Sequence, residues 1–83
     1  MTVDELITFC TLKGNIEYHE ELRPGFWRIR LLFGGKAVTF LYHKNPVDEK
    51  LIFLNGRVSS SEGDLGTTSE QIWGFNHLMK KLS

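Results

Sequence analysis

The sequence predicts a single α+β domain over residues 1–83, in the order helix, three strands, a further pair of short strands, helix. Two observations predict this class: apolar residues repeat with helical spacing near each end of the chain, and apolar and polar residues alternate between them. Turns that contain glycine divide the alternating segment into antiparallel strands. We expect two layers, in which an antiparallel sheet is covered on one face by both helices.

The composition is that of an ordinary globular domain, with 41% hydrophobic and 24% charged residues. The 10 basic and 10 acidic residues cancel, whereas domains that bind the nucleic-acid backbone usually have a basic excess. The single cysteine, Cys10, excludes an internal disulfide, which favours a reducing compartment. No apolar run approaches the roughly 20 residues of a membrane span. We therefore expect a cytoplasmic protein that does not associate with membranes.

The first helix is expected over residues 3–13. Thr2 and Glu5 have the spacing of a capping box, and Gly14 is expected to end the helix in a left-handed conformation. One apolar face follows the i, i+3, i+4, i+7 spacing of a buried helix side. Its residues are Val3, Leu6, Ile7 and Cys10.

Two turns separate the strands expected over residues 16–22, 26–33 and 36–43. Pro24-Gly25 fits the central positions of a type II turn, and Gly34-Gly35 fits a two-residue hairpin. Counting outward from Gly34-Gly35 fixes which side chains share a face, because successive side chains of a strand alternate between its two faces. The predicted core set is Trp27, Ile29, Leu31, Val38, Phe40 and Tyr42.

Counting outward from Pro24-Gly25 predicts the register of the first strand. It places Leu22 and Tyr18 on the core side and His19 on the opposite face. The same count puts Glu20 on the core side, where a carboxylate is unfavourable. An open sheet edge or a β-bulge near Glu20 would resolve this conflict.

The second half of the chain is expected to contain a short hairpin, a loop and a helix. Asn55-Gly56 is the strongest short hairpin signal in the sequence, and residues 59–66 read as a mobile loop rich in Ser and Gly. The last helix is expected over residues 68–82. Trp73 is expected to be buried beside its apolar stripe, which is Ile72, Phe75, Met79 and Leu82.

The side chains that alternate with the predicted core form the candidate binding surface. Basic and apolar residues are interleaved on this face. The pattern fits a solvated face with cross-strand ion pairs, and it also fits a surface that binds a partner. The predicted partner-binding residues are Phe26, Arg28, Arg30, Leu41 and His43.

The sequence contains no recognisable catalytic or metal-binding pattern. The three histidines have no metal-ligand spacing with one another or with Cys10. No glycine-rich segment has the downstream lysine of a phosphate-binding loop. Cys10 falls on the expected buried face and lacks the electropositive setting of a reactive thiol. We therefore predict a protein that is not an enzyme and needs no cofactor or metal.

Two patterns early in the chain have a counterpart in a known family. The spacing of Leu6, Cys10 and Gly14 is similar to the first helix of the double-stranded-RNA-binding domain. Residues 27–31, followed by Gly34-Gly35-Lys36, resemble the second strand and turn of that domain. The resemblance implies an α-β-β-β-α topology and phosphate contacts from lysines at the start of the last helix. The corresponding residues 67–71 contain no lysine, so RNA binding is not carried over.

These features predict a non-enzymatic protein-binding module: an accessory, regulatory or inhibitory protein of a kind found in phages and mobile elements. Its partner is expected to be another protein. The alternative is a nucleic-acid-binding domain with a divergent double-stranded-RNA-binding-like topology. Its contacts would come from a basic stripe with Phe26 and Tyr42 nearby, made of Arg23, Arg28, Arg30, Lys36 and Lys44. The oligomeric state stays open, since an exposed edge over residues 51–54 would allow pairing with a second copy.

Overall fold

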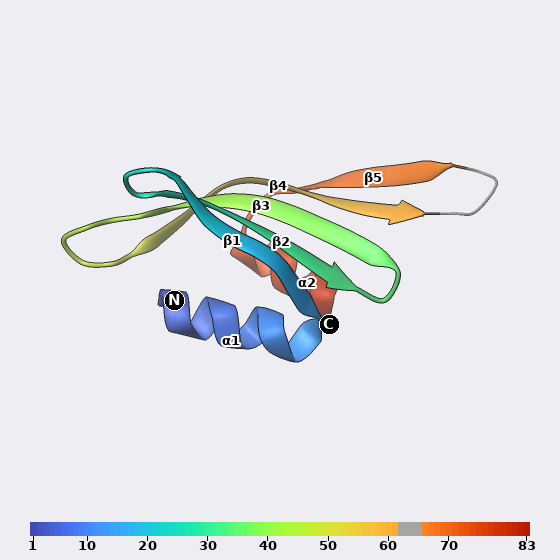
Figure 1. The fold of residues 1–83 in the computed structure, drawn as a ribbon, viewed down its shortest axis with the longest axis horizontal. Helices are drawn as coiled ribbons and strands as arrows, with labels where there is room; N and C mark the ends of the chain where they lie inside the picture. The colour runs from blue at the N-terminus through green and yellow to red at the C-terminus, as the bar shows by residue number, and fades with distance from the viewer. Residues whose placement is uncertain (62–65) are drawn as a thin grey trace.

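The computed structural model describes residues 1–61 and 66–83. Within these described residues the chain forms two helices and five strands (Figure 1). In chain order they are α1 (Val3–Lys13), β1 (Asn15–Arg23), β2 (Phe26–Phe33), β3 (Lys36–Lys44), β4 (Leu51–Ser61), β5 (Thr67–Ile72) and α2 (Phe75–Leu82). The strands form one antiparallel sheet whose spatial order equals the chain order. The predicted α+β class with an antiparallel sheet is therefore confirmed.

Helix α1 forms where the sequence predicts it. The Thr2 hydroxyl accepts a hydrogen bond of 3.2 Å from the backbone N–H of Glu5 and so caps the first turn. Leu6 and Cys10, on the predicted apolar face, are completely buried. Within residues 1–61 and 66–83, neither α1 nor α2 has the length and apolar character that a membrane-crossing helix needs.

Gly14 ends α1 for a reason that differs from the prediction. Its φ of −170° is extended rather than left-handed. A Cβ at this position would collide with the carbonyl oxygen of Leu32 and would lie 2.8 Å from the Cβ of Phe33. The chain therefore needs glycine here because it passes so close to β2 as it leaves the helix.

The hairpin of β2 and β3 has the predicted register along its whole length. Gly34 and Gly35 adopt φ angles of 51° and 76°, in the left-handed region that a two-residue hairpin requires. Trp27 is partly buried and packs against the core. The other predicted core residues of this hairpin are completely buried: Ile29, Leu31, Val38, Phe40 and Tyr42.

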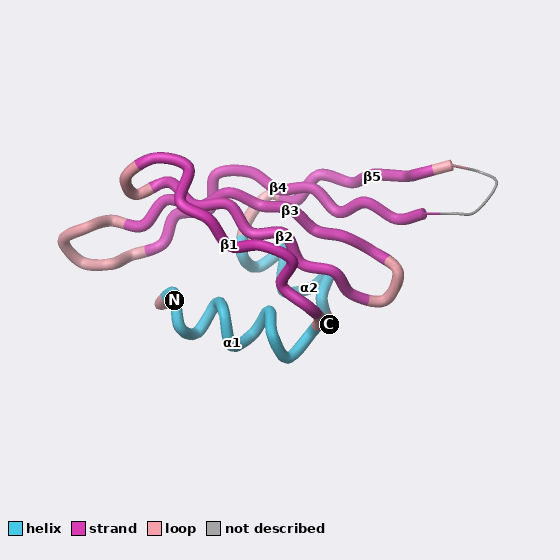
Figure 2. Tube along the Cα trace, viewed as in Figure 1, coloured by secondary structure: helices cyan, strands magenta, loops and turns pink. Residues whose placement is uncertain are grey.

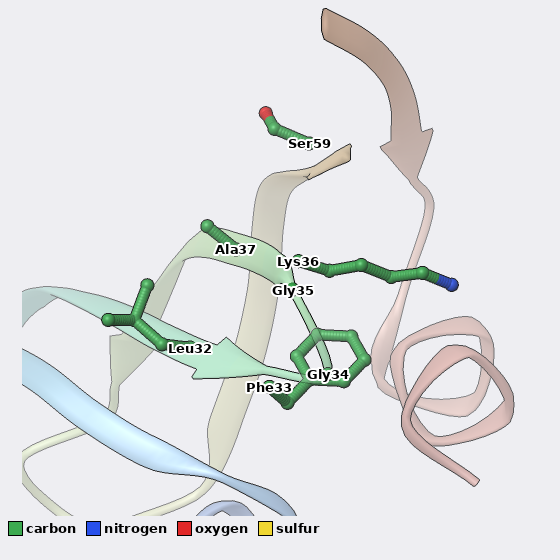
Figure 3. Close-up of a pocket in the computed structure, with 7 residues that line it drawn as sticks. All are labelled: Leu32, Phe33, Gly34, Gly35, Lys36, Ala37 and Ser59. Carbon is green, nitrogen blue, oxygen red and sulfur yellow. The ribbon is translucent and has the colours of Figure 1, made fainter. Parts of the chain in front are cut away.

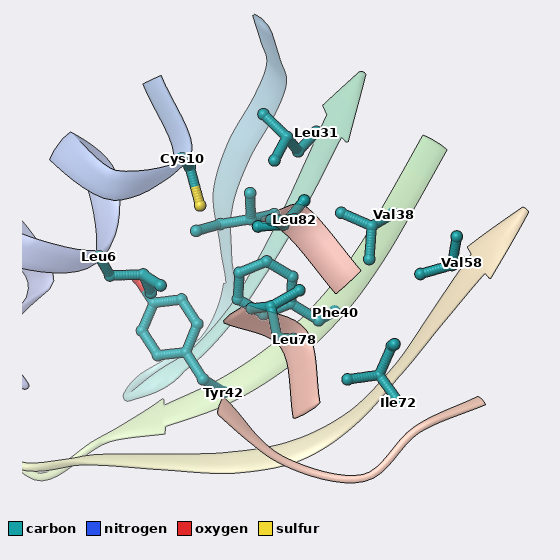
Figure 4. Close-up of a cluster of buried hydrophobic side chains, with 11 residues drawn as sticks. Leu6, Cys10, Leu31, Val38, Phe40, Tyr42, Val58, Ile72, Leu78 and Leu82 are labelled. Carbon is teal, nitrogen blue, oxygen red and sulfur yellow. The ribbon is translucent and has the colours of Figure 1, made fainter. Parts of the chain in front are cut away.

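A single cluster of buried apolar side chains joins the helices to the sheet. Leu6 and Cys10 enter it from α1, and Leu78 and Leu82 enter it from α2. Figure 4 shows these side chains gathered around the aromatic rings of β3. In the view of Figure 1, both helices lie below the sheet.

The register of β1 differs from the prediction because of a bulge. Arg23 pairs with Phe26, but the next pair is Glu21 with Trp27, so Leu22 is an extra residue. A bulge moves every following residue by one position relative to the partner strand. Because side chains alternate, that single step exchanges the faces of residues 18–21. A second irregularity, between Ile16 and Tyr18, returns Ile16 to the core side opposite Leu31.

This exchange corrects three of the predicted positions. Glu20 lies opposite Arg28 on the outer face, which removes the carboxylate from the core. Tyr18 also moves to the outer face. His19, which the sequence places outside, lies on the core side opposite Ile29. Both features considered for the Glu20 conflict are present, since β1 is an edge strand and carries a bulge, and it is the bulge that moves Glu20 to the outer face.

The predicted hairpin at Asn55-Gly56 does not form. Strand β4 runs straight through these residues and pairs with β3 on both sides of them. Gly56 lies opposite Phe40, and a Cβ there would lie 2.8 Å from the Phe40 Cβ and 2.9 Å from the ring of Phe53. Glycine is required here because β3 and the Phe53 ring lie too close for a side chain, and not because the chain turns.

The predicted last helix is divided into a strand and a short helix. Residues 67–72 form β5, which pairs with β4, and only Phe75–Leu82 is helical. Ile72 keeps its predicted place in the core, although it lies on a strand. Trp73, which the sequence places in the core, is 74% exposed. This arrangement departs from the α-β-β-β-α topology implied by the resemblance to the double-stranded-RNA-binding domain.

The predicted mobile loop over residues 59–66 is also partly wrong. Residues 59–61 belong to β4 and pair with β5. Residues 62–65 of that loop lie outside the described part of the chain.

Replacing Gly56 with Ala is expected to destabilise the fold by about 1–3 kcal/mol, as is typical when a tightly packed core is overfilled. The added methyl group must displace the Cβ of Phe40 or the ring of Phe53. Denaturant unfolding followed by circular dichroism measures the change. The control, Asn55→Ala at the exposed neighbouring position, should alter the free energy of unfolding by less than about 0.5 kcal/mol. Equal stability of Gly56→Ala and the wild type would contradict the close packing.

Candidate functional site

The β2–β3 register brings all five predicted partner-binding residues onto one face of the sheet, the outer face. Phe26 pairs with His43 and Arg28 pairs with Leu41, in rows that alternate with the core rows. Arg30 pairs with Thr39 in the next such row. All five predicted residues are partly exposed. The register therefore places them together, while their binding of a partner stays a prediction.

Glutamates of β1 hold the two central arginines of the outer face. The Arg28 guanidinium donates two hydrogen bonds to Oε1 of Glu20, and the one from Nε is 2.9 Å long. Arg30 donates to Glu17 at 2.6 Å and to the Thr39 hydroxyl at 3.4 Å. The hydrogen bond to Glu20 raises the pKa of Arg28. Because 40% and 38% of the arginine side chains are exposed, these pairs orient the guanidinium groups more than they stabilise the fold.

Aromatic rings pack against cations at the same face. The guanidinium of Arg23 lies 4.1 Å from the ring centroid of Phe26, and that of Arg28 lies 5.1 Å from Tyr18. The rings of Phe26 and His43 are 4.8 Å apart. Cations in this position are attracted to the faces of the rings. The stacked groups give the outer face an ordered, amphipathic surface.

A hollow of about 370 Å³ continues the outer face toward β5. It is lined by Thr39, Leu41, Asn55, Gly56, Arg57 and Gln71. Arg57 lies between Thr39 of β3 and Gln71 of β5 in the strand register. It is exposed and makes no ion pair with any residue that the structure describes. The hollow therefore offers one uncommitted guanidinium group among hydroxyl and amide groups.

Asn55, Arg57 and Gln71 are absent from the sequence-based site. The first two were assigned to a hairpin, and Gln71 was assigned to a helix. Only the pairing of β4 with both of its neighbours brings the three together. The signal that would have found the first two is the alternation of Asn55 and Arg57 with Gly56 and Val58, which has the period of a strand.

A second, shallow depression of about 480 Å³ surrounds the β2–β3 turn (Figure 3). Its lining residues are Leu32, Phe33, Gly34, Gly35, Lys36, Ala37 and Ser59. Figure 3 shows the Lys36 side chain extending away from Leu32 and Ala37. The lining holds one ammonium group and one hydroxyl group, and it contains no carboxylate or imidazole that would complete an acid–base pair with them.

The groups with reactive or metal-binding chemistry are dispersed. Within residues 1–61 and 66–83, no group of three or more His, Cys, Asp or Glu side chains is placed to hold a metal ion. Cys10 is completely buried, and burial raises the pKa of its thiol to about 11. The thiol is therefore protonated at neutral pH, which makes it a poor nucleophile.

A partly buried hydrogen bond links His19 to Tyr42 on the core side. His19 Nε2 lies 2.6 Å from the Tyr42 hydroxyl, and the His19 ring centroid lies 4.9 Å from that of Trp27. Burial lowers the pKa of His19. Burial, with a smaller effect from Cys10, raises the pKa of Tyr42 to about 12. Both effects favour a neutral imidazole beside a protonated phenol at neutral pH.

The comparisons with known proteins find no matching protein family and no significantly similar curated protein or solved structure. The candidate site is therefore defined by its geometry: ion-paired arginines, stacked rings and a polar hollow on one face of the sheet.

The fold is expected to lose stability as the pH falls below about 6.5, the ordinary pKa of histidine. The pKa of His19 is lower in the folded protein than in the unfolded chain, so the unfolded chain binds the proton more readily. The stabilisation is therefore fully present above the pKa that His19 has in the unfolded chain. It is lost as the pH falls through the lower pKa that His19 has in the folded protein. Urea unfolding of the wild type and of His19→Gln, between about pH 5 and 8, measures this effect. Glutamine keeps a hydrogen-bonding side chain but does not titrate, so parallel curves for the two proteins would contradict the role of His19.

Proposed function

We propose that this domain is a non-enzymatic protein-binding module that contacts its partner through the outer face of the sheet. The observation that carries the proposal is the β2–β3 register, which gathers five partly exposed residues on that face. They are Phe26, Arg28, Arg30, Leu41 and His43. Arginine and aromatic residues are enriched at the energetic centres of protein interfaces. An accessory, regulatory or inhibitory role, as in small proteins of phages and mobile elements, suits such a module.

In the proposed arrangement the domain has two layers, and both helices pack against the core side of the sheet. The buried cluster supports this arrangement, because it combines side chains of α1 and α2 with one set of alternating strand positions. The opposite set of positions, on the outer face, then has no covering layer within the described chain.

Contacts within the outer face support binding because they order long side chains before a partner arrives. Arg28 is held by Glu20 and stacks on Tyr18. Binding usually costs the conformational entropy of interface side chains, and ordering them in advance reduces this cost. In the neighbouring hollow, Arg57 is an exposed donor for a charge-assisted hydrogen bond. This chemistry fits a partner that presents a carboxylate between apolar groups.

Nucleic-acid binding is the alternative function, and the four arginines at or beside the outer face favour it. They are Arg23, Arg28, Arg30 and Arg57. Against it, Glu17 and Glu20 already neutralise two of them and would repel phosphates. A salt titration of binding to duplex and single-stranded nucleic acid distinguishes the two functions, since phosphate contacts weaken steeply as the salt concentration rises.

The double variant Arg28→Glu/Arg30→Glu is expected to reduce capture of the protein partner by about tenfold or more, the effect of losing one interface hot spot. Each new carboxylate would face the carboxylates of Glu20 and Glu17 and would repel an acidic partner. The measurement is affinity capture from a nuclease-treated extract of the native host. Lys13→Glu/Lys80→Glu is the control, because it reverses the same number of charges on the two helices.

A photo-crosslinking residue at position 41 provides the second readout. It should attach to the captured protein, whereas the same residue at position 12, which is exposed on α1, should not. Undiminished capture by the arginine variant, or equal crosslinking at both positions, would overturn binding through the outer face. Capture from an untreated extract that is lost after nuclease treatment would support the alternative function.

A further inference from the structure

The first half of β4 has an open edge. Strand β5 pairs only with residues 56–61 and ends where Ile72 lies opposite Gly56. Residues 51–55 pair with β3 on one side, and no described strand pairs with them on the other. Figure 2 likewise shows β5 alongside only one half of β4.

Strand β5 is prevented from continuing along this edge. The backbone N–H of Trp73 donates a hydrogen bond of 3.2 Å to Nδ1 of His77, and Gly74 then begins α2. The chain therefore leaves the sheet directly after Ile72. The edge of residues 51–55, which precede Gly56, is therefore left without a neighbouring strand from β5.

The open edge lacks charge and proline, two of the features with which proteins usually block strand addition. At the opposite edge of the sheet, β1 carries several charged residues and two register irregularities. Residues 51–54 read Leu-Ile-Phe-Leu, without charge or proline. Ile52 and Leu54 are 53% and 44% exposed. An uncharged apolar strand with a free edge is a template for a further strand.

We propose that this edge pairs with the same edge of a second copy of the chain, antiparallel about a two-fold axis at Phe53. The two sheets then become one continuous sheet. In this register Ile52 lies opposite Leu54 of the second copy, and both side chains are exposed. The interface is self-complementary, as a two-fold dimer requires, and no like charges face each other in it.

The length of the open edge fits this pairing. A ladder centred on Phe53 uses residues 52–54 of each copy, because the irregularity at Leu54 puts Leu51 and Asn55 on opposite faces. Strand β4 begins at Leu51, so the second copy's strand starts opposite Asn55, one residue before the position that β5 occupies. The two copies thus fit together without displacing β5.

One further feature favours a second copy at this edge. Trp73 follows the last residue of β5 and stands at the end of the open stretch, where the second copy's chain enters. Its exposed indole is of the residue type most favoured as an interface anchor.

The expected dimer is weak and reversible. A ladder of this length buries less than the roughly 1,600 Å² of a standard interface. We expect a dissociation constant of about 10–100 μM. The weight-average mass should therefore rise from 9.6 kDa toward twice that value as the protein concentration rises to about 1 mM, as measured by sedimentation equilibrium.

A charge-swap experiment tests the register. Ile52→Lys/Leu54→Lys places like charges opposite each other in the dimer, and so does Ile52→Glu/Leu54→Glu. Each variant alone should remain a monomer, whereas their equimolar mixture should associate because every lysine then faces a glutamate. Both side chains are exposed, so the fold should be kept, and circular dichroism checks this. Leu12→Lys, the same change at an exposed position of α1, is the control and should dimerise as the wild type does.

Three results would overturn the proposal. The first is a wild type that remains at 9.6 kDa at about 1 mM. The second is a mixture of folded charge variants that stays monomeric. The third is an equal loss of association in Leu12→Lys. Association of the wild type and of the mixture, but of neither charge variant alone, would support the pairing at residues 52–54.

Discussion

The pairing of β2 with β3 is the constraint on which both faces of the sheet depend. Gly34 and Gly35 provide the two left-handed residues of the turn and so leave a single register for the strands that follow. A slip of one residue would put Phe40 and Arg28 on the same face, so that either Phe40 would move into solvent or Arg28 would enter the core. The neighbouring strands adjust to this pair: β1 through its bulges, and β4 through a glycine and a bulge of its own.

Sequence analysis correctly predicts the parts of the fold that are determined by residues close together in the sequence. The α1 face follows from helical spacing, and the β2–β3 register follows from a turn of two residues. The predicted β1 register is wrong because the bulge at Leu22 has no signature in residue type, and one extra residue reverses the side chains from Glu21 to Tyr18. Its only trace was the misplaced Glu20, whose charge was incompatible with the core.

The sequence predicts only part of the candidate site, because the rest depends on pairing between strands that lacks a local signal. Its five predicted residues lie on one well-defined hairpin, whereas Arg57 and Gln71 lie on strands that were misassigned. Glycine permits both positive φ angles and close backbone approach, and the sequence around Gly56 does not distinguish the two roles. Ile72 satisfied a helical repeat with Phe75, although it reaches the core from the end of a strand. Tertiary packing therefore decides those assignments.

The chain-order arrangement of the sheet has a consequence for folding kinetics. Every strand pairs with its neighbour in sequence, so each pairing closes a loop from one strand to the next. Sheets with such local pairing form faster than sheets of similar size whose strands are distant in sequence. Helices α1 and α2 meet the same core from opposite ends of the chain, so their docking closes the largest loop and comes late. The hairpin that decides which residues are buried is thus also the segment expected to form first.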